Sequence, residues 1–138
     1  MREPSELRRH DDPPALTVLG REARQPIDHV EVFPAPDHVT VVRCVTDEVA
    51  SRCPVTEQPD LSRVEIEYEP AGLCVESKSL KLYLWSFRDR AVFAEALAAE
   101  IAGEIHATAR PRRVTVTLTQ RPRGGITITA VAERSDQR

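Results

Sequence analysis

The C-terminal part of the chain constrains the fold most, because two alternating segments there are joined by a short turn that contains glycine. Residues Val114 to Thr119 read VTVTLT and residues Ile126 to Val131 read ITITAV, so apolar and polar side chains alternate in both. This period of two is typical of a β-strand with one buried face. The glycines between Arg121 and Gly125 suit a tight hairpin. We therefore predict a pair of antiparallel strands.

A second pair of strand patterns lies earlier in the chain. Val39 to Val45 is rich in β-branched residues, and Arg63 to Glu69 (RVEIEYE) alternates strictly. Asp47 to Asp60 contains two prolines and several polar residues, which indicates a long loop between these strands. Long loops in compact domains are often functional, and Cys53 lies in this one. Pro26 to Pro36 is interpreted as a proline-punctuated connector and not as a strand.

Two helices are predicted between the strand pairs. In Glu76 to Arg88 most apolar residues recur at helical spacing. Ala91 to Ala107 is alanine-rich with apolar residues at intervals of four, and Pro111 ends this clearer amphipathic helix. The order strand, strand, helix, helix, strand, strand predicts an α+β fold, in which a four-stranded antiparallel sheet has its helices on one face.

The size of the chain favours a subunit that needs neighbours. The 138 residues correspond to one domain, and an apolar fraction of 41% suffices for one modest core, so any deep pocket is expected between subunits. A four-stranded open sheet leaves two edges unpaired, and a ring of subunits joined edge to edge would pair them. A net charge of -3 argues against a protein that binds nucleic acid by neutralising phosphates.

The ends of the chain and its cysteines bear on organisation and compartment. We expect residues 1–15 to be a disordered tail, residues 16–132 to be the domain, and residues 133–138 to be a second tail. No signal-peptide pattern and no apolar run of membrane length occurs. The three cysteines are odd in number and lack paired spacing, which argues against a secreted disulfide framework. We expect a cytoplasmic protein.

The segment Arg52 to Asp60 (RCPVTEQPD) contains the residues best suited to covalent chemistry. Cysteine attacks as a thiolate, and an adjacent cation such as Arg52 would lower the pKa of Cys53. A loop that folds back would bring Asp60 to the thiol, where a carboxyl group out of water can stay protonated and act as a general acid. The alternative is a buried structural cysteine next to an aspartate in a turn.

A zinc site is a competing interpretation, but no two of its candidate ligands have the close spacing of zinc-binding motifs. These candidates are Cys44, Cys53, Cys74 and one of His10, His29, His38 or His106. We therefore do not predict a metal ion, and His106 is interpreted as a polar neighbour of a helix end.

Two other segments could bind a phosphate. At Glu76 to Tyr83 (ESKSLKLY), hydroxyl and ammonium groups occur at the expected start of a helix, where free backbone N–H groups and the helix dipole favour an anion. At Pro122 to Gly125 (PRGG), two glycines beside an arginine permit close approach of the backbone to a nucleotide. The structural alternatives are a solvated helix face with a capping serine and a tight hairpin.

The motifs CPVTEQPD, VESKSLKLYLWSFRD and PRGGI occur in an order and at separations that resemble the QueF family of 7-cyano-7-deazaguanine reductases, over roughly residues 16–131. This resemblance implies the T-fold (tunnelling fold), a ββααββ subunit that assembles into stacked rings. It also implies that NADPH reduces the nitrile of 7-cyano-7-deazaguanine to an aminomethyl group through a cysteine thioimide. The free base, not the tRNA, would be the substrate in this step of queuosine synthesis.

The resemblance also assigns roles to individual residues. Cys53 is expected to be the nucleophile and Asp60 the acid that protonates the nitrile nitrogen. The substrate would bind to Val75, Glu76, Ser77, Ala94 and Glu95. NADPH would bind to Ser77 and Lys78 and, from another subunit, to Arg123 and Gly124.

Three positions depart from the family pattern. Ala94 stands where the family usually has histidine, Glu57 where it usually has glycine, and Leu97 where some relatives have a second cysteine. Glu57 adds a charge and removes backbone freedom near Cys53. Two alternatives stay open: a QueF-like amidinotransferase, whose relatives lack the cofactor signature, and a non-catalytic or altered paralogue that binds a deazaguanine.

Overall fold

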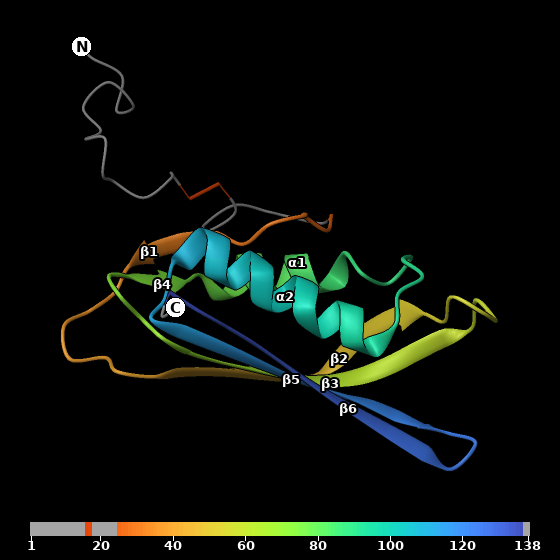
Figure 1. Cartoon of the computed structure of the whole chain (residues 1–138). Coiled ribbons are helices and arrows are strands. Elements are labelled where there is room, and N and C mark those ends of the chain that lie inside the picture. Colours follow the sequence, from red (N-terminus) through yellow and green to blue (C-terminus); the bar gives the residue numbers. More distant parts are fainter. Residues whose placement is uncertain (1–15, 18–24, 137–138) are drawn as a thin grey trace.

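The computed structural model describes residues 16–17 and 25–136, which form a sheet with helices on one face (Figure 1). Four antiparallel strands make up the main sheet in the order β2-β3-β5-β6, and β1 pairs with β4 in a small second sheet. The elements are β1 (Val32–Pro34), β2 (Val42–Arg52), β3 (Pro59–Glu69), β4 (Leu73–Val75), α1 (Ser77–Trp85), α2 (Ala94–Ala109), β5 (Arg113–Arg123) and β6 (Ile126–Ser135). The predicted α+β architecture is confirmed.

The core lies between the sheet and the helices. Alternate residues of β3 and β5 face the helices, and each is at most 1% exposed: Val64, Ile66, Tyr68, Val114, Val116 and Leu118. α2 contributes Leu97, Ile101 and Ile105, at the interval of four residues that the sequence predicted. Burial of this apolar face is the main source of stability for both layers.

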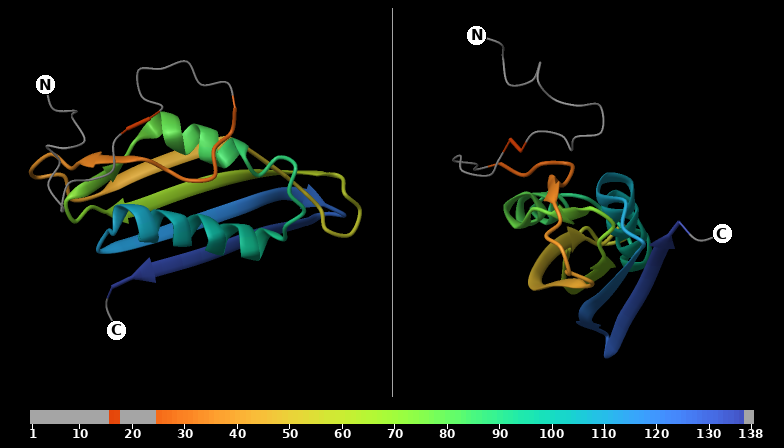
Figure 2. Two further views of the ribbon diagram at one scale, coloured as in Figure 1. Left: turned by 90° about the horizontal axis from the view of Figure 1, so that it is seen from above. Right: turned by 90° about the vertical axis from the view of Figure 1, so that its left-hand side faces the viewer.

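The two helices run along the sheet in opposite directions (Figure 2). α1 begins directly after β4, at the end of the sheet where β3 finishes. α2 begins at the other end, close to the connection between β2 and β3. It ends at Arg110, whose φ of 49° and ψ of 50° stop the helix just before Pro111. The helix end predicted from Pro111 is confirmed.

The long loop expected from Asp47 to Asp60 is wrong over most of its length, because β2 and β3 extend into it from both sides. A register shift between Thr46 and Val49 interrupts the alternation of buried residues, which hid the strand pattern. Pro59 is tolerated because it is the first residue of its strand. The loop itself covers only residues 53–58.

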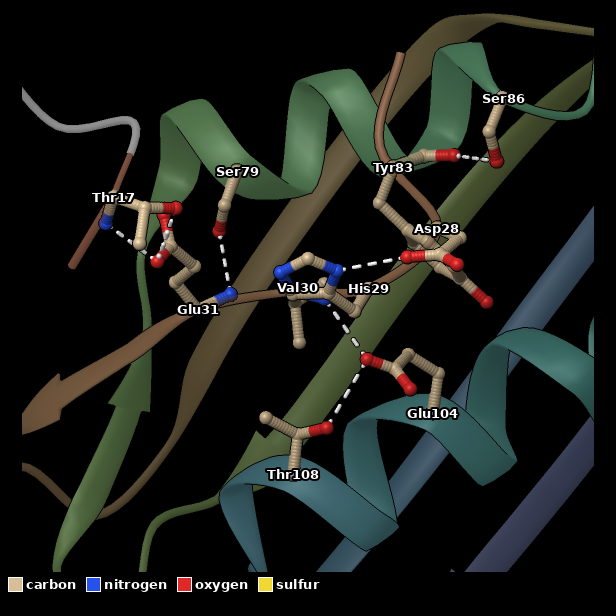
Figure 3. Close-up of polar contacts among 10 residues, drawn as sticks. All are labelled: Thr17, Asp28, His29, Val30, Glu31, Ser79, Tyr83, Ser86, Glu104 and Thr108. Carbon is tan, nitrogen blue, oxygen red and sulfur yellow. Dashed lines mark hydrogen bonds and ion pairs between the residues drawn. The ribbon is translucent and has the colours of Figure 1, made fainter. Parts of the chain in front are cut away.

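The segment Pro26 to Pro36 is more than a connector, because β1 forms inside it and pairs with β4. The residues before β1 run between the two helices (Figure 3). The Val30 N–H donates to Glu104 Oε2 and the Glu31 N–H donates to Ser79 Oγ, both at 2.8 Å. This strand was missed because it is short and proline-flanked, and its partner lies far along the chain.

The described residues extend the domain at its C-terminal end. β6 continues to Ser135, past the boundary expected at residue 132, because its last residue pairs with Arg113 at the start of β5. The tail expected at residues 1–15 lies outside the described residues. Among the described residues, no helix has the length and apolar character needed to cross a membrane.

Candidate active site

Cys53 lies where β2 ends and the chain turns toward β3, and it is 6% exposed. Two backbone hydrogen bonds close this turn. The Cys53 N–H donates to the Gln58 carbonyl at 2.9 Å, and the Glu57 N–H donates to the Cys53 carbonyl at 2.8 Å. Glu57 has a φ of 62°, in the left-handed region that favours glycine. The turn therefore fixes the cysteine at the expense of backbone strain at Glu57.

The surroundings of the Cys53 sulfur favour the thiolate. The pKa of Cys53 is lowered from 9.0 to about 6, chiefly by the hydroxyl of Thr56. The backbone N–H groups of Thr56 and Val55 and the guanidinium of Arg123 lower this pKa further, while burial opposes them. Each of these donors stabilises negative charge on the sulfur. At neutral pH the nucleophilic form of Cys53 therefore predominates.

The cation beside Cys53 is Arg123 and not Arg52, so that part of the sequence interpretation is wrong. The guanidinium of Arg52 donates instead to Asp89 Oδ1 at 3.2 Å. Arg123 arrives from the far end of β5, after a register shift that follows Gln120. Local spacing around Cys53 could not have indicated this contact, because the strand pairing creates it.

Asp60 is the second residue of β3 and is 2% exposed. Its Oδ1 lies 2.7 Å from Arg123 Nη1, so the two side chains form an ion pair. The contact does not have hydrogen-bond geometry, and within the described part of the chain Oδ1 has no hydrogen-bond partner. The structure thus gathers Cys53 and Asp60 around one guanidinium and leaves a buried carboxylate oxygen able to bond with another group.

Asp60 belongs to a buried polar patch at this end of the sheet. In the strand ladders Ser51 is opposite Asp60 and Gln120 is opposite Ser62, and each of these residues is at most 5% exposed. The hydroxyl of Ser62 also finds no hydrogen-bond partner among the residues that are described. Buried polar atoms normally have such partners. The patch is therefore suited to receive polar groups of a ligand.

The start of α2 lies next to this patch. The Arg52 N–H donates to the Arg90 carbonyl at 2.8 Å, and the Val92 N–H donates to the Arg52 carbonyl at 3.1 Å. Ala94 is 3% exposed and belongs to the core, whereas Glu95 is exposed in the first turn of the helix. Of this predicted substrate-binding pair, only Glu95 presents its side chain to solvent in one subunit.

Glu76 is the N-cap of α1. Its Oε1 accepts the backbone N–H of Lys78 and its Oε2 accepts that of Ser79, each at 2.7 Å. The sequence suggested a capping serine and N–H groups free for a phosphate, but two of these N–H groups bind Glu76. The carboxylate that the helix dipole favours is thus supplied by the chain itself.

Neighbouring segments hold Glu76 in place. The Val75 N–H donates to the Tyr68 hydroxyl and the Glu76 N–H donates to the Glu31 carbonyl, both at 2.8 Å. Glu31 is a second buried carboxylate at this end, and its Oε2 accepts the N–H and the hydroxyl of Thr17 at 2.6 and 3.0 Å (Figure 3). Sequence reasoning missed Glu31, because no motif marked it.

The predicted site residues therefore lie at two opposite ends of the main sheet. Cys53, Asp60 and Arg123 lie where β3 begins, and Glu76 and its neighbours lie near the opposite end of β3 (Figures 1 and 2). Asp60 and Tyr68 are eight positions apart in β3, which at about 3.3 Å per residue corresponds to roughly 26 Å. One subunit alone does not bring the two groups into one pocket.

Groups with the chemistry of phosphate binding occur at both ends. Ser77 is exposed and Lys78 is half-buried on α1, and the side chain of Arg123 is 45% exposed. Gly124 and Gly125 have φ values of 59° and 79°, and a side chain at either would meet no atom within 4 Å. The hairpin tip is thus open to close approach by a ligand. This set of donors fits a phosphorylated dinucleotide.

A cavity of about 830 Å³ lies between β2 and α1. Its mainly apolar lining includes Val45 and Trp85, together with Ser77. Cys53 and Asp60 do not line it. The described ranges, 16–17 and 25–136, contain no group of three or more His, Cys, Asp or Glu side chains that could hold a metal ion.

Comparisons with known proteins give matches across most of the chain. A family model described as QueF, a QueF-like protein, matches residues 59–138. A protein of Syntrophus aciditrophicus named NADPH-dependent 7-cyano-7-deazaguanine reductase is 43% identical over 125 residues, which are 89% of this chain and 89% of that protein. A protein of Frankia casuarinae with the same name is 40% identical over 84% of this chain and 93% of its own length.

A solved structure is similar as well. It is titled the crystal structure of the archaeosine synthase QueF-Like in the apo form, and it matches with a TM-score of 0.69 and 27% identity. The match covers 74% of this chain and 100% of that chain. The architecture described above is therefore shared with a protein of known structure.

Proposed function

The chain belongs to the QueF family, and we propose that it is an NADPH-dependent 7-cyano-7-deazaguanine reductase. It converts the nitrile of the free base to an aminomethyl group, and the product enters queuosine synthesis. The fold is the T-fold of this family, with the ββααββ order of the main sheet and helices. The observation that carries the proposal is the placement of the Cys53 thiolate and the Asp60 carboxyl around Arg123.

The first step uses only groups of the chain. The thiolate of Cys53 adds to the nitrile carbon, so that a C–S bond forms and one π bond of the nitrile opens. The electron pair of that bond moves to the nitrogen, which takes a proton from the carboxyl group of Asp60. The resulting thioimide accepts hydride more readily than the nitrile does. The lowered pKa of Cys53 supplies the thiolate without a separate base.

Residues of the chain hold and orient the cofactor. Ser77 and Lys78 of one subunit, with Arg123 and Gly124 of another, would bind the phosphates of NADPH. When bound there, NADPH would supply the hydride that the thioimide and then the imine need for reduction to the amine. The open backbone at Gly124 supports this assignment, because a ligand can approach it without a steric clash.

The substrate base would bind to groups from both ends of the main sheet. Each oxygen of the Glu76 carboxylate accepts one N–H in the structure and retains a second lone pair for the guanine-like edge. Val75 and Ser77 flank Glu76, and Glu95 with Ala94 lies near Cys53. The separation of roughly 26 Å along β3 supports a site completed by a neighbouring subunit. We therefore also propose a homo-oligomer, in stacked rings.

The amidinotransferase alternative is not favoured. The similar solved structure is an archaeosine synthase, but it is 27% identical, whereas relatives named reductases are 40 to 43% identical. The cofactor signature from Glu76 to Tyr83, which the amidinotransferase relatives are expected to lack, is present in this chain. Its free cysteines, Cys44, Cys53 and Cys74, support the cytoplasm as the compartment.

A cofactor titration tests the proposed reaction. The purified oligomer is mixed with 7-cyano-7-deazaguanine and NADPH, and the absorbance of the reduced nicotinamide is followed. We expect two NADPH to be consumed for each nitrile. Cys53→Ala is expected to remove both the adduct and the consumption, while Cys44→Ala, at a second free cysteine, should retain them. A covalent adduct without NADPH consumption in the wild type would contradict the reductase and favour the amidinotransferase.

A further inference from the structure

The guanidinium of Arg123 is the one group within the described chain shown to contact both proposed catalytic side chains. Its Nη1 lies 2.7 Å from Asp60 Oδ1, and the guanidinium is near enough to the Cys53 sulfur to help lower the pKa of that thiol. Its own pKa is raised, first by the hydrogen bond with Cys53 and also by the charge of Asp60. The resemblance to the family assigned Arg123 only to the cofactor. Its position beside Cys53 and Asp60 indicates that Arg123 also acts on the nucleophile and on the acid.

Other charged groups near the thiol do not duplicate this contact. The loop contributes Glu57, which carries the wrong charge to stabilise a thiolate. β2 contributes Arg52, whose guanidinium donates to Asp89. Asp60, from β3, is itself negative when ionised. A buried thiolate requires a cation nearby, and so does the buried Asp60 carboxylate that remains after the carboxyl group has given up its proton. Arg123 lies beside both groups.

We propose that Arg123 is a positioning residue for covalent addition to the nitrile, in addition to any contact with the cofactor. It holds the Cys53 sulfur and the Asp60 carboxyl group beside one another before the substrate binds. This inference rests on the proposed function, and it adds a role in a step that requires no NADPH.

The addition step explains why one cation serves both partners. As the C–S bond forms, negative charge leaves the sulfur and reaches the nitrile nitrogen, which takes the proton of Asp60. The negative charge therefore ends on the Asp60 carboxylate. A guanidinium in contact with the sulfur at the start and with the carboxylate at the end stabilises the charge throughout its movement. Arg123 needs only small adjustments to follow it, because its guanidinium contacts Asp60 and already acts on the Cys53 thiol.

The experiment measures the adduct in the absence of NADPH. Wild type, Arg123→Met, Arg123→Lys and Arg121→Met are mixed with 7-cyano-7-deazaguanine, and the covalent adduct is quantified by intact mass. Arg121→Met is the matched control, because it removes an exposed arginine from the same strand. We expect Arg123→Met to form the adduct roughly fivefold more slowly near pH 6, since loss of a cation raises a thiol pKa by about one unit and so lowers the thiolate fraction. Arg123→Lys should lie between Arg123→Met and the wild type.

A second readout is independent of the nitrile. Alkylation of Cys53 by iodoacetamide is followed across pH by peptide mass spectrometry, and the midpoint of the profile should move to higher pH in Arg123→Met and not in Arg121→Met. If circular dichroism shows that Arg123→Met does not fold, the adduct rate and the alkylation profile of Arg123→Lys test the inference instead. Adduct formation and alkylation profiles equal to the wild type, with only a higher KM for NADPH, would overturn the inference. Absence of an adduct in the wild type would instead contradict the proposed reaction, and alkylation would still test Arg123.

Discussion

At the Glu76 end of the sheet a buried carboxylate has both oxygens hydrogen-bonded to backbone N–H groups, whereas at the Cys53 end the buried Oδ1 of Asp60 has only a cation beside it. The first carboxylate holds a helix start in place. The second lies beside a thiolate and an unsatisfied serine hydroxyl, Ser62. Unsatisfied buried groups cost stability, so they are found where a ligand completes them. The Cys53 end is therefore suited to bond-making chemistry and the Glu76 end to rigid binding.

A large effect is expected from the acid at the Cys53 end. Asp60→Asn keeps the size of the side chain but removes the proton donor, and turnover should fall by roughly 10² to 10⁴-fold. Adduct formation should become slow or unproductive, while the free energy of unfolding changes little. Steady-state reduction and intact mass measure the two effects. Wild-type turnover in Asp60→Asn would show that Asp60 is not the acid.

Mixed oligomers test whether the two ends meet between subunits. Cys53→Ala and Glu76→Gln are each expected to be inactive as pure oligomers. Co-assembled in equal amounts, they should regain roughly a quarter of wild-type activity, because random pairing gives some sites an intact Cys53 end and an intact Glu76 end. NADPH consumption in the refolded mixture measures this. A mixture as inactive as its components would place both ends of a site in one subunit.

The thiolate at the Cys53 end predicts a pH profile. The pKa of Cys53 is lowered to about 6, so its reactive form is present above that pH and is lost as the pH falls through 6. Alkylation near pH 7 should be faster than for an ordinary thiol with a pKa near 8.5, because the thiolate fraction of Cys53 is roughly thirtyfold higher at that pH. Thr56→Val, which removes the hydroxyl with the largest influence, should move the midpoint upward. A wild-type midpoint near 8.5 would contradict the assigned hydrogen bonds.

The Glu76 end predicts an effect on stability as well as on binding. Glu76→Ala removes the cap of α1, and the free energy of unfolding should fall by about 1 kcal/mol. Glu76→Asp retains a capping carboxylate but moves it, so stability should be close to the wild type while the KM for the substrate rises. Chemical denaturation and steady-state kinetics separate the two effects. Equal KM values for Glu76→Asp and the wild type would restrict this residue to a structural role.

The smallest expected effect concerns strain in the Cys53 turn. Glu57→Gly relieves a residue with a φ of 62°, although glycine also costs entropy, and the net gain in unfolding free energy should be about 0.5 kcal/mol. Chemical denaturation measures it, with Glu57→Ala as the control that retains the strain. A destabilised Glu57→Gly would show that the glutamate side chain supports the turn.

The sequence alone determined most of the architecture and the motifs. Period-two alternation in Arg63 to Glu69 and in the C-terminal hairpin indicated the sheet, and intervals of four residues indicated α2, because each element buries one face. The same residues carried the family resemblance and the choice of Cys53 and Asp60. Where a local feature broke the pattern, as at the register shift in β2, the strand was mistaken for a loop.

Only the tertiary structure decided which side chains meet. The pairing of β3 with β5 places Arg123 beside Asp60 and Cys53, and the sequence instead suggested Arg52. The length of β3 separates Glu76 from the thiol, although both lie in recognisable motifs. The physical reason is that periodicity and propensity act between near neighbours along the chain. Contacts between distant segments depend instead on strand register and helix direction, which the packing of the whole domain fixes.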